Sequence, residues 1–186
     1  MDKNLIMMAK QVQSTYSSPI VAAKINGEVR DIQTVYEDTD QIDFIELDSP
    51  LGWVIYRRSV LFLLIAAVHK LDNNAEVIAK FTVNKGLYCE IKIPAGELDP
   101  SFIKEIEDRM GDMIAANIPI EKRSIPRQEA INLFQKLGRE GKVNLLSALS
   151  NPTISIYTCD GYTDYLYGAM LPETKDLGLF ELDYER

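Results

Sequence analysis

Residues 56–71 are apolar on nearly every side when wound as a helix, and charged residues flank the apolar run. A helix of this kind is buried in the middle of a domain. Its uncharged run, residues 59–68, is only about half of the ~20 residues that span a bilayer, so we expect a core helix and no membrane span. Because steps of three, four and seven residues return to one helix face, Arg58, Phe62 and His69 share a stripe.

The remaining pattern alternates short strands with helices and predicts an α+β fold, in which the long central helix lies on a mainly antiparallel sheet. Asn26-Gly27 between two apolar runs favours a tight hairpin turn. Residues 48–52 are the predicted linker, which divides the chain into residues 1–50 and 51–186. The other predicted strands are 41–47, 77–83, 87–93, 154–159, 162–167 and 178–182, and the other helices are 5–13, 99–116, 142–149 and one that begins at Pro126.

The composition limits the classes of partner. The net charge of −8 opposes unspecific attraction to phosphate backbones, so tRNA is not expected as a partner. Two cysteines, Cys89 and Cys159, and the single histidine cannot form a zinc site on their own, and we expect both thiols to be reduced. The N-terminus leads into a short amphipathic stretch and has no long apolar signal segment, so the expected location is cytoplasmic.

Five stretches carry a resemblance to a known domain, and two of them are residues 117–121 and 127–134. Residues 57–64 read Arg-Arg-Ser-Val-Leu-Phe-Leu-Leu, residues 86–91 read Gly-Leu-Tyr-Cys-Glu-Ile, and residues 164–172 read Asp-Tyr-Leu-Tyr-Gly-Ala-Met-Leu-Pro. Together they are similar to the second additional domain, the editing module of threonyl- and alanyl-tRNA synthetases. The resemblance spans roughly residues 53–183 and implies the editing-domain fold for residues 51–186.

The departures from that family concern its zinc ligands. Arg58 and Phe62 stand where the family has a His-x-x-x-His pair, and Leu166 and Met170 stand where it has Cys-x-x-x-His. Zinc needs about three nitrogen, oxygen or sulfur ligands and a bound water for hydrolysis, which these side chains do not supply. The resemblance therefore implies an editing scaffold without metal or other cofactor. The candidate binding residues in this vestigial pocket are Arg58, Phe62, Tyr88, Asp164, Leu166 and Met170.

Each candidate also has a structural alternative. Arg58 could bind a carboxylate or phosphate of a ligand, or form a salt bridge with Asp164 or Glu90. Tyr88 could line a pocket or simply pack against neighbouring strands. Met170 and Phe62 are expected to face each other and to fill the former metal cavity with a thioether–aromatic contact.

The N-terminal 50 residues resemble the later part of a TGS domain, a small β-grasp whose first hairpin would precede Met1, so a truncated, internally started or shortened domain is expected.

A TGS-like piece before an editing-like domain resembles the N-terminal half of bacterial uridine-kinase-like proteins. This implies a non-catalytic regulatory or ligand-binding module, with a kinase domain that uses ATP and Mg beyond residue 186, and a nucleotide or amino acid as ligand. No P-loop motif occurs in these residues, so the segment itself is not expected to phosphorylate. Alternatives are a tRNA-binding or trans-editing deacylase domain, and a protein-interaction or dimerisation module.

Overall fold

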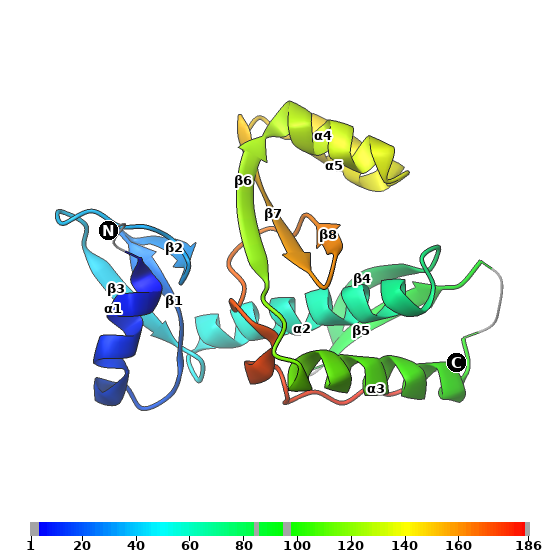
Figure 1. The fold of residues 1–186 in the computed structure, drawn as a ribbon, viewed down its shortest axis with the longest axis horizontal. Coiled ribbons are helices and arrows are strands. Elements are labelled where there is room, and N and C mark those ends of the chain that lie inside the picture. The colour runs from blue at the N-terminus through cyan, green and yellow to red at the C-terminus, as the bar shows by residue number, and fades with distance from the viewer. Residues whose placement is uncertain (1–3, 84–85, 95–97, 185–186) are drawn as a thin grey trace.

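The computed structural model describes residues 4–83, 86–94 and 98–184. Within these residues all paired strands are antiparallel and form three small sheets, ordered β2-β1-β3, β4-β5 and β6-β7-β8. Figure 1 shows helix α2 running through the middle of the molecule, with the first sheet at one end of it. The predicted α+β class is confirmed, although the antiparallel pairing is divided among separate sheets.

The central helix α2 spans Pro50–Leu71 and starts earlier than the sequence predicted. The Ser49 side chain accepts a hydrogen bond from the Gly52 N–H at 3.0 Å, and Pro50 occupies the first turn, where its missing N–H costs nothing. The predicted linker is therefore mostly the cap and first turn of this helix. By length and composition α2 could cross a membrane, but 56% of its most apolar window is buried inside the protein, as in a core helix.

The N-terminal unit contains α1 (Leu5–Val12), β1 (Ile20–Ile25), β2 (Glu28–Asp31) and β3 (Ile42–Glu46). The predicted hairpin is confirmed, because Asn26 and Gly27 both have positive φ, 53° and 85°. A Cβ added to Gly52 would lie 2.7 Å from the carbonyl oxygen of Leu47, so the chain after β3 approaches α2 too closely for a side chain there. The TGS-like assignment and the domain division at residue 50 stay predictions.

Helix α3 (Pro100–Ala115) and the hairpin of β4 (Glu76–Val83) and β5 (Gly86–Lys92) pack around α2. Asp99 caps α3 by accepting a hydrogen bond from the Phe102 N–H at 2.8 Å, as its position before Pro100 predicts. The inward face of α3 includes Ile106, Met110 and Met113, all buried in the main core with α2. Residues 84–85, in the predicted hairpin turn, lie outside the described residues.

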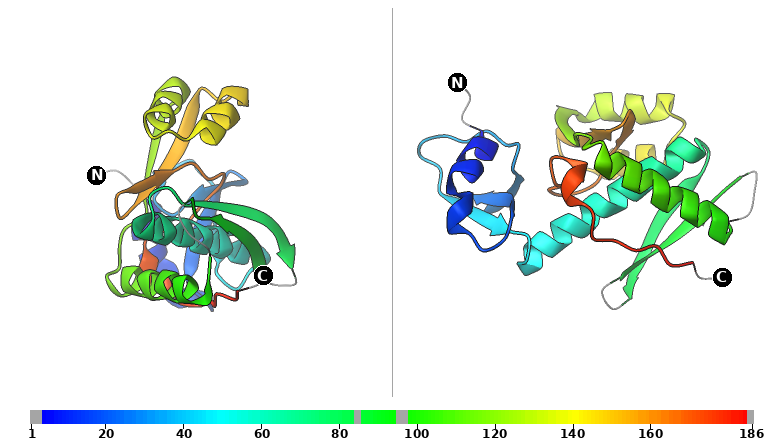
Figure 2. Two further views of the ribbon diagram at one scale, coloured as in Figure 1. Left: turned by 90° about the vertical axis from the view of Figure 1, so that its right-hand side faces the viewer. Right: turned by 60° about the horizontal axis from the view of Figure 1, so that its bottom comes forward.

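The third part consists of β6 (Glu121–Pro126), α4 (Arg127–Lys136), α5 (Glu140–Ala148), β7 (Thr153–Cys159) and β8 (Tyr162–Asp164). Figures 1 and 2 show β6 and β7 extending away from α2 and carrying α4 and α5 at their far end. These helices have a separate core that includes Ala130, Phe134, Leu146 and Ile156.

After β8 the chain returns to α2. A short 3-10 helix, η2 (Thr174–Asp176), is followed by a segment with no assigned strand, so the predicted strand at 178–182 is wrong. This segment lies beside α2 instead, and the Leu179 N–H donates a hydrogen bond to the Tyr56 hydroxyl at 2.7 Å.

Candidate functional site

The predicted pocket is a packed region in the structure. Phe62 is fully buried on α2 and Met170 is 1% exposed, and both belong to the main core. The Phe62 ring contacts the rings of Tyr157 and Tyr162, with centroids 6.4 and 5.9 Å apart. Leu166 packs against the same core from the segment that follows β8. Aromatic and aliphatic side chains therefore fill the place where the resemblance puts metal ligands.

Arg58 is held by the main chain of that returning segment. Its guanidinium donates a hydrogen bond to the Ala169 carbonyl at 2.6 Å. Gly168 has φ +103°, and a Cβ there would lie 2.8 Å from the guanidinium carbon, so any other residue at 168 would be strained in its backbone and would displace the Arg58 guanidinium. Burial lowers the pKa of Arg58, while the neighbouring Tyr157 and Asp31 act in the opposite direction.

Neither salt bridge considered for Arg58 forms. Asp164 is 2% exposed and pairs with Lys142 at 2.9 Å, while it also accepts hydrogen bonds from the Tyr162 hydroxyl and the Tyr165 N–H, at 3.1 and 2.7 Å. Glu90 pairs with Lys80 across the β4–β5 hairpin. Asp164 is thus a buried carboxylate at the end of β8, and both of its oxygens are bound by groups of the protein.

Tyr88 does not join the other predicted residues. It lies on β5, where its ring stacks on Phe81 with centroids 5.0 Å apart and 38% of the residue is exposed. Leu87 and Cys89, its neighbours along the strand, line a groove beside α2. Because side chains alternate across a strand, Tyr88 points to the opposite face of the hairpin, which is the packing alternative of the sequence analysis.

The residues in the family's ligand positions do not fit zinc. A guanidinium, a phenyl ring, an isobutyl group and a thioether give no set of three or four nitrogen, oxygen or thiolate ligands. Across residues 4–83, 86–94 and 98–184, no group of three or more His, Cys, Asp or Glu side chains is placed to hold a metal ion. We therefore derive no metal-dependent step for this site.

Sequence reasoning missed a residue that the fold brings to this region. Asp31, at the end of β2, is 3% exposed and accepts a hydrogen bond from the Tyr157 hydroxyl at 3.0 Å and from the Met170 N–H at 2.9 Å. Lys122 on β6 forms an ion pair with its other oxygen. Burial, with the charge of Asp31, raises the pKa of Tyr157 far above its usual value. Nothing in the sequence around Asp31 distinguishes it from a surface acid of a hairpin.

The Tyr157 hydroxyl also lies 2.8 Å from the Gly168 carbonyl oxygen, so its hydrogen is shared between that oxygen and Asp31. On the other side, the Leu171 N–H donates to the Ser59 hydroxyl at 2.9 Å. Consecutive residues of the returning segment are therefore fixed through their main chain, from α2, β7 and β2 together.

An open cleft of about 690 Å³ adjoins this network. Its walls come from the N-terminal unit, from β6 and β7, and from residues 165–169. Polar and apolar groups contribute about equally to its lining, and Tyr167 on its rim is 85% exposed. The polar side chains that line it include Arg30, Gln33, Lys122, Ser124, Asn151 and Ser155.

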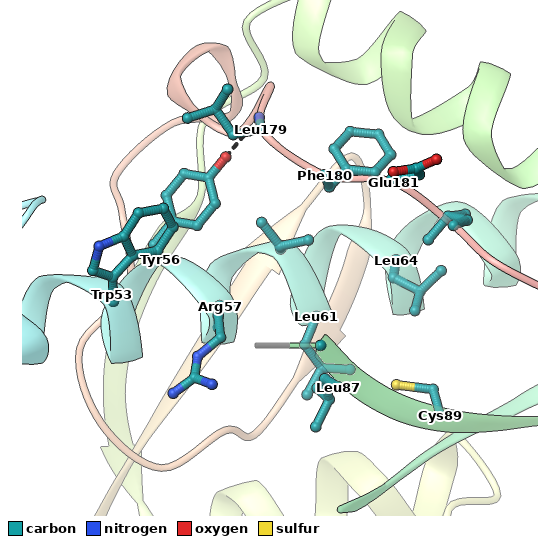
Figure 3. Close-up of a pocket in the computed structure, with 13 residues that line it drawn as sticks. Trp53, Tyr56, Arg57, Leu61, Leu64, Leu87, Cys89, Leu179, Phe180 and Glu181 are labelled. Carbon is teal, nitrogen blue, oxygen red and sulfur yellow. Dashed lines mark hydrogen bonds between the residues drawn. The ribbon is translucent and has the colours of Figure 1, made fainter. Parts of the chain in front are cut away.

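A second, mainly apolar groove of about 780 Å³ runs along α2 and is drawn in Figure 3. Its floor is the stripe of α2 that carries Trp53, Tyr56 and Leu61, and its walls are β5 and residues 179–182. Arg57 and Glu181 are its charged members. It lies apart from the predicted site residues, none of which lines it.

The structure is that of an α+β domain built on a buried helix, with a cleft beside the segment that returns to that helix. Comparison with known proteins identifies sequence relatives of the chain. The chain is 31% identical over 176 residues to the threonine–tRNA ligase of Syntrophotalea carbinolica, covering 94% of this chain and 28% of that protein. The corresponding ligases of Pelobacter propionicus and Acidithiobacillus ferrooxidans are 30% and 28% identical, over 94% and 95% of this chain.

These similarities support a threonyl-tRNA synthetase-type, editing-like domain. The chain spans about 28% of the length of these curated relatives. No family model matches it. The relatives give no support to the predicted nucleoside-kinase parentage, which stays a prediction.

Proposed function

We propose that this chain is a tRNA-binding module of the synthetase editing type, which receives the 3′ end of a tRNA in the open cleft and does not hydrolyse an attached amino acid by a metal-dependent route. The observation that carries the proposal is the cleft itself, formed beside residues 164–172 in a chain similar over most of its length to threonine–tRNA ligases.

The cleft offers the groups that a single-stranded nucleotide end requires. Tyr167 is 85% exposed on the rim and presents a free ring face on which a base can stack. Lys122 and Arg30 supply positive charge for phosphate oxygens, and Ser124 and Ser155 supply hydroxyls for ribose. A volume of about 690 Å³ is within the range of natural ligand pockets and suits one or two nucleotides.

The acidic composition argues against tight, unspecific binding of a whole tRNA, and it was the reason for not expecting tRNA as a partner. The similarity to tRNA ligases and the local charge of the cleft outweigh it for a short terminal segment. Lys122 is partly neutralised by Asp31, and Arg30 is paired with Glu28. We therefore expect only one or two phosphate contacts, and a slope of log K against log salt of about −1 to −2.

The cleft does not hold an evident hydrolytic group. Its described lining contains neither His nor Cys, and its one carboxylate, Asp31, is already bound by Lys122, Tyr157 and the Met170 N–H. His69 is on α2 against the Tyr162 ring, outside the cleft lining. A general base must reach the attacking water, and the described lining offers no imidazole and no unengaged carboxylate to do so.

The test is equilibrium binding of a fluorescent RNA hairpin that ends in single-stranded CCA, compared with the same hairpin without CCA, at about 50 mM salt. We expect CCA-dependent binding that Tyr167→Ala weakens about 5- to 150-fold, the equivalent of about 1–3 kcal/mol for one stacked base. The matched control is Tyr88→Ala, because Tyr88 is also an exposed tyrosine but lies on β5, away from the cleft.

Hydrolysis is measured separately with seryl- and alanyl-tRNA. We expect release of amino acid at the rate of buffer alone, with or without added zinc. Equal binding of the two hairpins would refute the proposed recognition of a 3′ end. Zinc-dependent release above the buffer rate would refute the proposal that the metal chemistry is lost.

A further inference from the structure

The carboxylate of Asp31 is buried in a part of the protein to which its own strand does not belong. Strand β2 is in the N-terminal unit, and Asp31 is 3% exposed. Among the described residues, the groups that donate to this carboxylate all lie beyond residue 120: the Tyr157 hydroxyl, the Met170 N–H and the Lys122 ammonium. The sequence separations are 126, 139 and 91 residues.

These donors have the arrangement of an anion-binding site. Two of them meet the same oxygen, Oδ1, at 3.0 and 2.9 Å, and Lys122 binds Oδ2. A carboxylate has two acceptor oxygens with about four lone-pair positions, so one cation and two neutral donors match it well. Arg58, beside the same segment, adds a second positive charge that interacts with Asp31.

Without Asp31 the Tyr157 hydroxyl keeps the Gly168 carbonyl oxygen as an acceptor, whereas the Met170 N–H and the Lys122 ammonium lose the carboxylate that they bind. Met170 is buried, and its N–H is not part of a strand ladder, so among the described residues Asp31 is the acceptor that it would lose. A buried donor left without a partner destabilises the folded state, and so does a cation without its counterion. A small anion that reaches the site therefore restores contacts that the protein has already positioned.

We propose that Lys122, Tyr157 and the main-chain N–H of Met170 form a carboxylate-binding site, whose ligand in this structure is the protein's own Asp31. A free carboxylic acid that enters from the adjoining cleft takes the same place when the end of β2 withdraws. Asp31, Lys122 and Tyr157 all line that cleft, so the site opens directly onto it. The site is distinct from the proposed tRNA role, because an amino acid esterified to tRNA has no free carboxylate.

The two occupants exclude each other, since the three donors can serve one carboxylate at a time. Binding of a free acid is then linked to release of Asp31. By the same linkage, any factor by which Asp31 binds the site more tightly lowers the affinity for the free acid by that factor. The ligand class is a small compound with an unesterified carboxylate, such as a free amino acid or a short organic acid.

The experiment is chemical rescue in the full chain. Asp31→Ala removes the carboxylate and leaves space for formate, which supplies the same two oxygens. Formate is titrated against sodium chloride at constant ionic strength, and the folding equilibrium constant is measured by urea unfolding. We expect formate to raise that constant in Asp31→Ala about 11-fold at ten times its dissociation constant, and less than about twofold in the unchanged protein.

Three variants make the test specific. Asp43→Ala removes an exposed carboxylate from strand β3 of the same unit and should show no formate effect. Asp31→Asn fills the space with an amide and should not be rescued. Asp31→Ala combined with Lys122→Met should lose the rescue, because the cation that binds Oδ2 is gone.

The proposal is overturned if formate stabilises Asp31→Ala no more than chloride does, or no more than it stabilises Asp43→Ala. If Asp31→Ala does not fold in chloride, its circular dichroism is followed as formate replaces chloride. Recovery of the folded spectrum supports the site, and a spectrum that stays unfolded at every formate concentration overturns it.

Discussion

Replacing Gly168 by alanine tests how the returning segment holds the Arg58 guanidinium. Gly168 has φ +103°, and a Cβ built there would lie 2.8 Å from the Arg58 guanidinium carbon and 2.8–2.9 Å from its terminal nitrogens. Two costs follow: the alanine must adopt a left-handed backbone conformation, and the guanidinium must leave the Ala169 carbonyl, which it binds at 2.6 Å.

The cost of the backbone conformation can be separated from the cost of displacing Arg58 by comparison with a second glycine. A left-handed conformation costs an L-residue about 1–2 kcal/mol, and a hydrogen bond to a charged group contributes about 1.5–3 kcal/mol. Because Arg58 is partly exposed and can turn to water, we expect Gly168→Ala to lower the free energy of unfolding by about 2–4 kcal/mol. Gly138 has φ +69° with nothing within 4 Å of its added Cβ, so Gly138→Ala should cost only about 1–2 kcal/mol.

The assay is urea unfolding followed by circular dichroism, for both glycine variants and for Gly168→Ala in an Arg58→Ala background. In that background the clash is absent, and the cost of Gly168→Ala should fall to that of Gly138→Ala. The reasoning is refuted if Gly168→Ala and Gly138→Ala differ by less than about 0.5 kcal/mol, or if removing Arg58 leaves the cost unchanged.

Three further predictions follow from burial. Phe62→Ala should destabilise the protein by about 3–5 kcal/mol because Phe62 is fully buried, whereas urea unfolding of Phe81→Ala, at a 57% exposed position, should show a much smaller change. Burial and a nearby guanidinium lower the pKa of His69 below its ordinary 6.5. The unfolded chain therefore takes up the proton first, and the free energy of unfolding should fall as the pH drops through about 6.5. An equal fall in the His69→Gln variant would contradict this. Burial raises the pKa of Cys159 to about 11, so a disulfide reagent at pH 8 should modify the half-buried Cys89 first, which mass spectrometry of the labelled peptides checks.

Local signals predicted most of the helices and strands. The apolar character of α2, the Asn26-Gly27 turn and the Asp99-Pro100 cap each depend on a few neighbouring residues, and each element formed where those residues indicate. Strand β6 escaped prediction because most of its residues are exposed and polar, so its alternation is weak. The strand predicted at residues 178–182 failed because an apolar segment can pack against a helix without a strand partner.

The site was less predictable because its contacts are long-range. The resemblance predicted that Arg58, Phe62 and Met170 lie in one region, and in the structure they do, because α2 carries the first two and the segment that returns to α2 carries the third. The same resemblance predicted Tyr88 in this region, but its side chain lies on the other face of strand β5, where it stacks on Phe81. Asp31 gave no signal, because its partners are 91–139 residues away and depend on how the N-terminal unit docks.

The returning segment, residues 168–171, is held without a metal at the place where the resemblance puts metal ligands. Residues 168–171 are fixed through main-chain groups: Tyr157 binds the carbonyl of 168, Arg58 that of 169, Asp31 the N–H of 170 and Ser59 the N–H of 171. A metal would fix the same segment through its side chains, and would therefore constrain their identity. Main-chain contacts do not fix the side chains by ligation, so the identities of Ala169, Met170 and Leu171 are limited instead by their packing in the main core. A histidine introduced at position 170 alone would not create a hydrolytic zinc site, because it supplies one ligand where about three are needed and Arg58, Phe62 and Leu166 supply none.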